Sequence, residues 1–319
     1  CLPAHMLFVS LVGCGGQEDG RVLKLAHSLD TSHPVHRAMV HMAERAAELS
    51  DGQLRIDIHP SGQLGEEREL IEMLQIGSIA MTKVSASPLE SFVPAMRVFS
   101  IPYLFRDQDH LWQVLDGEIG EGLLAAGTDY YLRGLGYYDA GPRSFYSTDT
   151  PIRTPQDLAG LKIRVQQSNT SLRMVRVLGG SATPIDWGEL YSALQQGVVD
   201  GAENNPPTII EHKHYEVTGY YSLTQHLMVP EIFVFSKKIW DKMSPLDQQL
   251  IRKASAACVI KERELWAAKE EKAYAELKKI GYSVNGDLDK EPFIQATEPV
   301  RQKFGGKYSE LIKRIQAVK

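Results

Sequence analysis

Arg164 is the residue whose position in this sequence most strongly requires a partner. It lies in the apolar segment Leu161–Val165, which we predict to be a β-strand. Burying an unpaired guanidinium is costly, and its planar donors suit two parallel hydrogen bonds to a carboxylate. The pattern leaves two alternatives open: recognition of a ligand's carboxylate, or an internal ion pair with an Asp or Glu.

Other polar and aromatic side chains could share such a site. Asn204 and Asn205 lie in Gly201–Pro207, which we predict to be a loop, a usual place for ligand contacts. Their amides could donate to the same oxygens or stabilise the turn. Trp187 begins a predicted helix beside Asp186, and it fits either the core or a stacking platform for a ligand ring.

Histidines raise the question of a metal site. Four lie close together in the sequence, namely His27, His33, His36 and His41. Histidine is a common zinc ligand, so a metal-uptake protein is one alternative, but the spacing matches no metal-binding motif. His212 and His214 lie two residues apart in a predicted helix, so we expect them to face apart on the surface.

Catalytic motifs are not found in the sequence. It contains no nucleophile elbow, HExxH or P-loop pattern. The glycines at 13, 15 and 16 precede the first predicted strand instead of following it, so a dinucleotide site is unsupported. Catalytic residues need not be close in sequence, and an enzyme that acts on a sugar acid stays an alternative.

Composition sets the broad class. The chain has 319 residues, more than one average domain, so we expect two lobes. Its 43% hydrophobic and 24% charged residues are typical of a globular protein with a sizeable core. The net charge of −5 argues against nucleic acid as the main partner.

The first 21 residues differ from the rest and suggest export. Met6–Val12 is apolar but too short to span a bilayer, as in the central region of a secretory signal. Leu11–Cys14 is similar to a lipoprotein signal, which makes Cys14 a candidate for lipidation and predicts a periplasmic location. Against this, the chain begins with Cys1 and no basic residue precedes the apolar run, so a tail with a chance apolar run is the alternative. Cys258, in a predicted helix, is expected to be a buried, inert thiol.

Strand-like and helix-like segments alternate, which predicts an α/β fold with largely parallel strands. The predicted strands are 23–27, 54–58, 79–84 and 161–165, and the predicted helices include 34–49 and 66–75. A capped helix starts at Thr154-Pro155, and another starts at Asp186 and is closed by Gly197.

The most informative element is a long helix. Ser244 to Asp247 form a helix start, and the helical pattern then continues to Gly281. Roughly 36 residues at about 1.5 Å each give about 54 Å, more than one lobe is wide. Two helices with a break near Cys258 are the alternative. A single helix would cross both lobes, which we divide as 22–141 plus 231–262 and 142–230 plus 263–319. Several crossings restrict motion to hinge bending, and a hinged cleft traps ligands.

Four stretches, in order, resemble a known family from about Leu23 to the C-terminus. They are Pro60–Gly65, Phe99–Phe105, Leu158–Val165 and Tyr191–Asn204. The family is that of the DctP-like solute-binding proteins of TRAP (tripartite ATP-independent periplasmic) transporters. The resemblance implies two α/β lobes joined by hinge strands and a long helix. It also implies delivery of a small organic acid to membrane permease subunits, without catalysis or a cofactor.

The resemblance also assigns site residues. Arg164 matches the family's carboxylate-binding arginine, Asn204 an asparagine that helps to hold the carboxylate, and Arg143 a second arginine that reaches the ligand. Trp187 falls where members place an aromatic side chain against the ligand. The positions that vary with substrate in the family are Glu67, Ser85 and Glu231. Three weaker candidates for ligand contact are His27, Lys83 and Gln167.

These variable positions bear on the substrate. Glu67, Ser85 and Glu231 offer acceptors and donors that suit hydroxyl groups, and the two carboxylates would repel a second carboxylate of the ligand. The segments 27–34 and 85–88 look most like those of the sugar-acid binders. We therefore expect a uronate such as D-glucuronate or D-galacturonate, with a C4-dicarboxylate or keto acid as the alternative that Arg143 leaves open.

Overall fold

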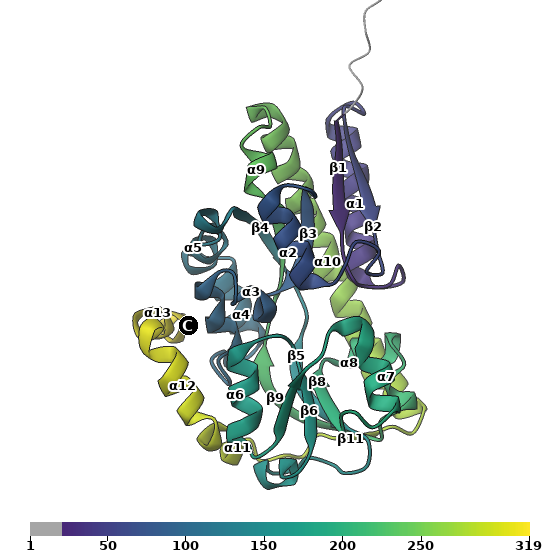
Figure 1. Cartoon of the computed structure of the whole chain (residues 1–319), viewed down its shortest axis with the longest axis vertical. Helices are drawn as coiled ribbons and strands as arrows, with labels where there is room; N and C mark the ends of the chain where they lie inside the picture. The colour runs from purple at the N-terminus through teal and green to yellow at the C-terminus, as the bar shows by residue number, and fades with distance from the viewer. Residues whose placement is uncertain (1–20) are drawn as a thin grey trace, which may run out of the picture.

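The computed structural model describes residues 21–319, which form two β-sheets flanked by helices and stacked along the long axis of the molecule (Figure 1). The leader and Cys14 lie outside the described residues. The five strands of the first sheet, in spatial order, are β2 (Leu54–His59), β1 (Arg21–Ala26), β3 (Met81–Ser85), β10 (Glu231–Ser236) and β4 (Leu132–Tyr138). The six strands of the second are β11 (Ser283–Asn285), β9 (Tyr220–Met228), β5 (Pro142–Ser147), β8 (Gly201–Asn204), β6 (Lys162–Val165) and β7 (Ser181–Pro184).

The α/β class is confirmed, but the prediction of largely parallel strands is wrong. Among the described strand pairs, five are parallel and four are antiparallel. The antiparallel pairs involve strands that pass between the sheets: β4 continues through residues 139–141 into β5, and β9 continues through 229–230 into β10. These two crossings run in opposite directions, so β10 pairs antiparallel with β4 and β9 pairs antiparallel with β5.

The predicted helices at 34–49, 66–75 and 244–281 are confirmed within a few residues. Helix α1 has the predicted bounds, and α2 ends at the left-handed Gly77. The helices before the second crossing are α1 (Pro34–Leu49), α2 (Glu67–Ile76), α3 (Ala86–Leu89), α4 (Gln108–Leu115), α5 (Glu118–Ala125), α6 (Asn169–Val177), α7 (Leu190–Gln195) and α8 (Pro206–Glu211). Those after it are α9 (Lys237–Trp240), α10 (Pro245–Lys279), α11 (Glu291–Ala296), α12 (Glu298–Gly305) and α13 (Ser309–Ala317). Short 3-10 helices are η1 (Pro94–Ser100), η2 (Thr128–Tyr130), η3 (Pro155–Leu158), η4 (Trp187–Glu189), η5 (His214–Glu216) and η6 (Gly306–Tyr308).

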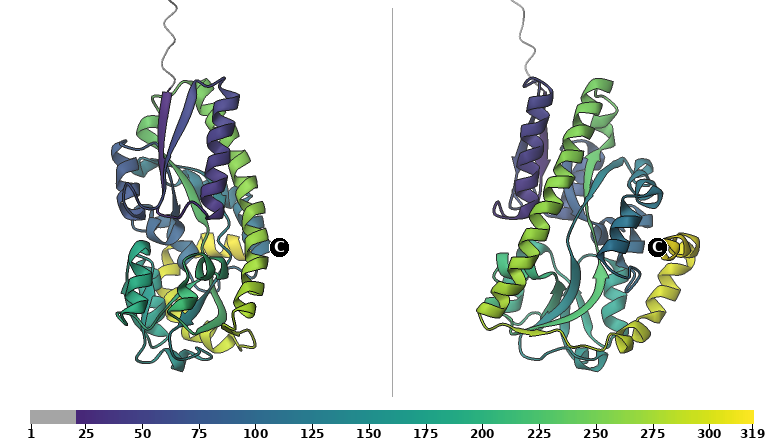
Figure 2. Two further views of the ribbon diagram at one scale, coloured as in Figure 1. Left: turned by 90° about the vertical axis from the view of Figure 1, so that its right-hand side faces the viewer. Right: turned by 180° about the vertical axis from the view of Figure 1, so that it is seen from behind.

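Helix α10 is one continuous helix of 35 residues, so the alternative of a break near Cys258 is wrong. Ser244 caps its start by accepting from the backbone N–H of Asp247. Figure 2 shows it running the length of the molecule beside both sheets. Its first half packs in the core of the first sheet through Ile251 and Cys258, and its second half packs in that of the second sheet through Ala273. Cys258 is fully buried as predicted, and burial raises the pKa of its thiol to about 12.

The C-terminal helices return toward the first sheet. The ring nitrogen Nε2 of His110, on α4, lies 2.9 Å from the carbonyl oxygen of Ile315, on α13. A large apolar cluster joins residues of both halves of the molecule, among them Phe99, Phe145 and Phe293. The division of the chain into lobes at the residues given above stays a prediction. Within residues 21–319, no helix has both the length and the apolar character needed to cross a membrane.

Candidate functional site

A cleft lies between the two sheets, with Trp266 of α10 among its lining residues. Eight of the ten predicted ligand-binding residues line it, and they come from both sheets: Arg143, Arg164, Gln167, Trp187 and Asn204 from the second, and Glu67, Lys83 and Glu231 from the first. His27 and Ser85 lie just behind this lining. His27 is buried with its Nε2 3.0 Å from Nδ1 of His36, and the hydroxyl of Ser85 donates to the cleft residue Gln166 at 3.2 Å.

Arg164 is a buried cation with unused hydrogen-bonding capacity. It is 3% exposed on β6, and its Nε donates to the carbonyl oxygen of Ile185 at 2.8 Å. Its Nη1 is buried without a hydrogen-bond partner, and no Asp or Glu within residues 21–319 forms an ion pair with it. Burial lowers the pKa of Arg164. Of the two alternatives, the internal ion pair is therefore wrong, and the guanidinium is free to pair with an anion.

Trp187 forms the wall beside this guanidinium. The Cζ atom of Arg164 lies 5.8 Å from the centre of the indole ring, within the range of a cation–π contact. The other side of the ring packs edge-on against His212, with ring centres 4.6 Å apart. Trp187 therefore contacts both the core and the cleft, and its stacking against a ligand ring stays a prediction.

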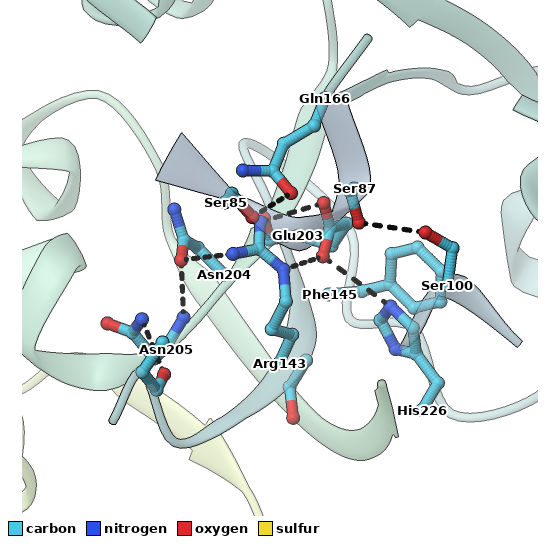
Figure 3. Close-up of polar contacts among 12 residues, drawn as sticks. Ser85, Ser87, Ser100, Arg143, Phe145, Gln166, Glu203, Asn204, Asn205 and His226 are labelled. Carbon is cyan, nitrogen blue, oxygen red and sulfur yellow. Dashed lines mark hydrogen bonds and ion pairs between the residues drawn. The ribbon is translucent and has the colours of Figure 1, made fainter. Parts of the chain in front are cut away.

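Arg143 differs from Arg164 in having an internal partner, Glu203 (Figure 3). Its Nε and Nη2 donate to the two carboxylate oxygens of Glu203 at 2.5 and 2.9 Å, and its Nη1 donates to Oδ1 of Asn204 at 3.1 Å. Burial alone would raise the pKa of Glu203, but the charge and hydrogen bonds of Arg143, helped by His226, lower it to about 2. This pair brings no net charge to the cleft.

Glu203 and His226 were missed by sequence reasoning. Nε2 of His226 lies 3.8 Å from Oε2 of Glu203, its Nδ1 lies 2.8 Å from the hydroxyl of Thr224, and its ring stacks on Phe145 with centres 4.2 Å apart. The sequence did contain a signal for Glu203, because this acid directly precedes Asn204 and a buried arginine needs a counter-charge. Which arginine it pairs with depends on the register of β5 against β8.

The prediction that Asn204 and Asn205 lie in a loop is wrong. Residues 201–204 form β8, and Asn205 is the N-cap of α8. The Oδ1 of Asn205 accepts from the N–H of Thr208 at 2.9 Å, and its Nδ2 donates to the carbonyl oxygen of Ala140 at 2.9 Å. An Asn followed by two prolines is a helix start, since Asn caps well and Pro fits the first turn.

On the other side of the cleft, Lys83 binds two carboxylates at once. Its Nζ lies 2.9 Å from Oε1 of Glu67 and 2.7 Å from Oε2 of Glu231. Burial would lower the pKa of Lys83, but the charges of Glu231 and Glu67 raise it. Burial and the charge of Glu67 raise the pKa of Glu231. The single ammonium of Lys83 offsets these two effects only in part. When all three groups are ionised, this cluster carries one net negative charge.

The prediction that His212 and His214 are surface residues that face apart is wrong. His214 is 1% exposed, its Nδ1 lies 2.8 Å from the hydroxyl of Tyr146, and the two histidine rings are 6.2 Å apart. Helix α8 ends at Glu211, and the left-handed Lys213 (φ 55°) turns the chain so that both rings lie on one side. Burial lowers the pKa of His212 to about 4 and of His214 to about 3.

The histidines near the cleft contact one another and their neighbours and do not point toward a common position where a metal ion could bind. His33 lines the cleft, and its Nε2 lies 3.6 Å from Oε2 of Glu211. Burial holds the pKa of His33 well below its ordinary value. No group of three or more potential metal ligands is found in residues 21–319. The cleft thus offers a free guanidinium on the side of the second sheet and carboxylate acceptors on the side of the first.

Comparison with known proteins identifies the family. The model of bacterial extracellular solute-binding protein family 7 (DctP) matches residues 25–307. A solute-binding protein of Chromohalobacter salexigens is 36% identical over 283 residues, which cover 88% of this chain and 83% of that protein.

Solved structures are similar over nearly the whole chain. A TRAP periplasmic solute-binding protein from Pseudomonas putida F1 with bound D-glucuronate has a TM-score of 0.91 and 41% identity, covering 94% of this chain and 98% of the other. One from Xanthobacter autotrophicus Py2 with bound β-D-galacturonate has a TM-score of 0.90 and 38% identity, covering 93% and 100%. This chain belongs to bacterial extracellular solute-binding protein family 7 and is a TRAP transporter solute-binding protein.

Proposed function

We propose that this protein binds a uronate, D-glucuronate or D-galacturonate, in the cleft between its sheets and delivers it unchanged to the membrane permease of a TRAP transporter. One observation carries the proposal: Arg164 is buried in the cleft with a free guanidinium N–H and no internal carboxylate. The two similar structures that contain a uronate support the choice of ligand.

In the proposed complex, the carboxylate of the ligand pairs with Arg164. Asn204 and Arg143, which lie beside it, hold the same carboxylate through their remaining donors, and Trp187 packs against the sugar ring. Arg143 is neutralised by Glu203, so Arg164 is the cation of the second sheet that is left to pair with a carboxylate. This matches a monoanionic ligand.

The hydroxyl groups of the ligand face the first sheet in this proposal. Glu67 and Glu231 accept from them, Lys83 keeps both carboxylates in place, and Gln167 contributes an amide. Ser85 and His27 act indirectly: Ser85 donates its N–H to Glu67 at 3.1 Å and its hydroxyl to Gln166, while His27 lies beside His36. The buried lysine of this side, Lys83, is already paired with both carboxylates, and the other cation lining the cleft there, Arg68, is half exposed and lies 3.4 Å from Glu72.

A ligand screen tests the proposal. Purified protein is heated with D-glucuronate, D-galacturonate, gluconate, succinate or pyruvate, and the unfolding temperature is recorded. A ligand present at about 100 times its Kd adds about 2.7 kcal/mol to the free energy of unfolding. We expect the largest shift with one of the two uronates. A shift with succinate alone would contradict the uronate and favour the C4-dicarboxylate alternative.

The non-enzymatic role and the location are part of the same proposal. After prolonged incubation with the bound uronate, we expect NMR of the released ligand to show the unchanged sugar acid at one per chain; product formation would favour an enzyme. Members of the family are periplasmic, and we propose that Cys14 is a lipidation site. Mass spectrometry of the exported protein would show a diacylglyceryl group on Cys14, and its absence would leave an unanchored protein.

A further inference from the structure

One face of α10 follows the strand crossing that leads into the cleft. Cys258 Sγ lies 2.9 Å from the hydroxyl of Tyr138, and four residues later Oε2 of Glu262 accepts from the backbone N–H of Asp139 at 2.8 Å. Trp266 and Glu270 come at the next two steps of four. We call Cys258, Glu262, Trp266 and Glu270 the hinge face of α10, because the residues opposite them join β4 to β5.

At Gly141 the crossing passes close to α10. Gly141 has φ +57°, and a side chain there would lie 2.8 Å from Oε1 of Glu270 and 3.4 Å from Nε1 of Trp266. Two residues further along is Arg143, which lines the cleft. A change in the angle between the sheets therefore alters the surroundings of Glu270.

The hinge face and the crossing beside it carry three acidic residues, Asp139, Glu262 and Glu270, and no cation of the described part of the chain is paired with them. Asp139 and Glu262 are 4% and 0% exposed, and no ion pair of residues 21–319 includes either of them or Glu270. Asp139 accepts from the N–H of Gly141 at 2.9 Å and from Gln108 at 2.5 Å, whereas Oε1 of Glu262 has no partner. Burial raises the pKa of all three carboxyl groups, and burial and the charge of Asp139 raise that of Glu270 to about 7.

The neighbours of Glu270 confirm this absence of positive charge. Asp139 faces it from the crossing, Tyr221 from β9, and Trp266 and Tyr274 from α10 itself. Burial raises the pKa values of both phenols, that of Tyr274 to about 12, so they are neutral. The nearby cations are engaged elsewhere: Lys269 with Glu211 at 2.9 Å, Arg143 with Glu203, and Arg263 with Asp116.

We infer that Glu270 couples ligand binding to proton uptake: when the cleft closes on its ligand, the crossing packs onto α10 and the carboxylate of Glu270 takes a proton from solvent. The inference rests on the proposed function only in assuming a hinged cleft that closes on an organic acid. The packed form favours the neutral carboxyl because ionised Glu270 would be desolvated next to Asp139.

The sign of the effect follows from linkage. A carboxyl group in water has a pKa near about 4.3, so the open form binds fewer protons at Glu270 than the packed form between roughly pH 4.5 and 7. Ligand affinity must then fall as pH rises through this range. With pKa values of about 4.3 and about 7 in the two forms, we expect about a thirtyfold loss between pH 5.5 and pH 8, which corresponds to one proton taken up over about 1.5 pH units.

Calorimetry of the full chain tests the coupling. The acid that binds in the screen described above is titrated at pH 6.5 in two buffers of different ionisation enthalpy, and the difference in heat gives the protons taken up. We expect clear uptake by the wild type, none by Glu270→Gln, and unchanged uptake by Glu271→Gln, an exposed neighbour on the same helix. No uptake by the wild type, or equal uptake by Glu270→Gln, would overturn the inference.

A ligand-free measurement separates this inference from the identity of the ligand. Without ligand the cleft is open and Glu270 is solvated in this account, so the unfolding temperatures of the wild type and Glu270→Gln are expected to change equally between pH 5 and pH 8. A ligand-free wild type that loses more stability than Glu270→Gln as pH rises would show that Glu270 takes up its proton before any ligand binds, and this would overturn the inference even if no acid of the screen binds. If succinate binds with proton uptake that Glu270→Gln abolishes, the uronate proposal fails and this inference holds.

Discussion

Arg143, which lines the ligand cleft, forms a bidentate, buried ion pair with Glu203 behind it, with Nε–Oε2 and Nη2–Oε1 distances of 2.5 and 2.9 Å. The pair separates the roles of the two arginines. Arg143 is neutralised and held in place, and Arg164 is left with the unpaired charge. The charge that a ligand meets on this side of the cleft is therefore set by Arg164.

Replacing Glu203 with Gln should destabilise the protein. Arg143 would stay buried without its counter-charge, and breaking such a pair costs about 3–5 kcal/mol. Urea unfolding at pH 7 measures the change, with the exposed Glu271→Gln as the control. A loss as small as that of the control would mean that the pair contributes little to folding.

Lys83→Met should also destabilise, and more at pH 8 than at pH 5. Without Lys83, Glu67 and Glu231 face each other without a cation, at a cost of about 3–5 kcal/mol when both are ionised. The pKa of Glu231 is already raised and rises further in the variant, so acid relieves the repulsion by adding a proton. Thermal unfolding at the two pH values, with the exposed Lys242→Met as control, checks this; a loss that does not depend on pH would contradict it.

Buried histidines should make the protein less stable in mild acid. Burial lowers the pKa of His214 in the folded state to about 3, while in the unfolded chain it is about 6.5. The unfolded state therefore binds more protons between these values, and the free energy of unfolding falls as pH drops from 6.5. Each unit of pKa shift is worth about 1.4 kcal/mol. Urea unfolding at pH 7, 6 and 5 should show a shallower dependence for His214→Gln, and an unchanged dependence would remove His214 as the cause.

Asn205 should contribute through two separate hydrogen bonds. Asn205→Ala removes the cap of α8 and the bond to Ala140, at a cost of about 1–3 kcal/mol. Asn205→Ser keeps a capping oxygen and lacks the donor to Ala140, so its unfolding temperature should lie between those of the wild type and the alanine variant. Equal losses in both variants would show that the cap is dispensable.

Features that depend on local sequence could be predicted, and features that depend on strand register could not. The long helix α10 was predictable because Ser244 caps its start and no glycine interrupts it before residue 281. Arg164 was recognisable as an arginine in an apolar strand. That Glu203 pairs with Arg143 and not with Arg164 depends on how β5 and β8 align.

The errors have equally specific causes. The left-handed conformation of Lys213 brings His212 and His214 together, and lysine is not a residue type that predicts this conformation. The antiparallel pairs arise from strands that pass between the sheets, which local periodicity does not report. Glu67 and Glu231 were recognised as acceptors, but their sharing of Lys83 became visible only when β3 and β10 were placed side by side.

The central claim is that Arg164 binds the carboxylate of a uronate, and calorimetric titration of the wild type and Arg164→Ala with D-glucuronate and D-galacturonate tests it most directly. Loss of a charged hydrogen-bonding partner is expected to cost roughly 2–5 kcal/mol, a thirtyfold to several-thousandfold loss of affinity. Arg164→Ala also removes the hydrogen bond to Ile185 and the contact with Trp187, so circular dichroism and the unfolding temperature of the ligand-free variant are recorded to show that it is folded. Tight uronate binding by the wild type that is abolished in Arg164→Ala is the predicted result, and undiminished affinity in the variant would contradict the account.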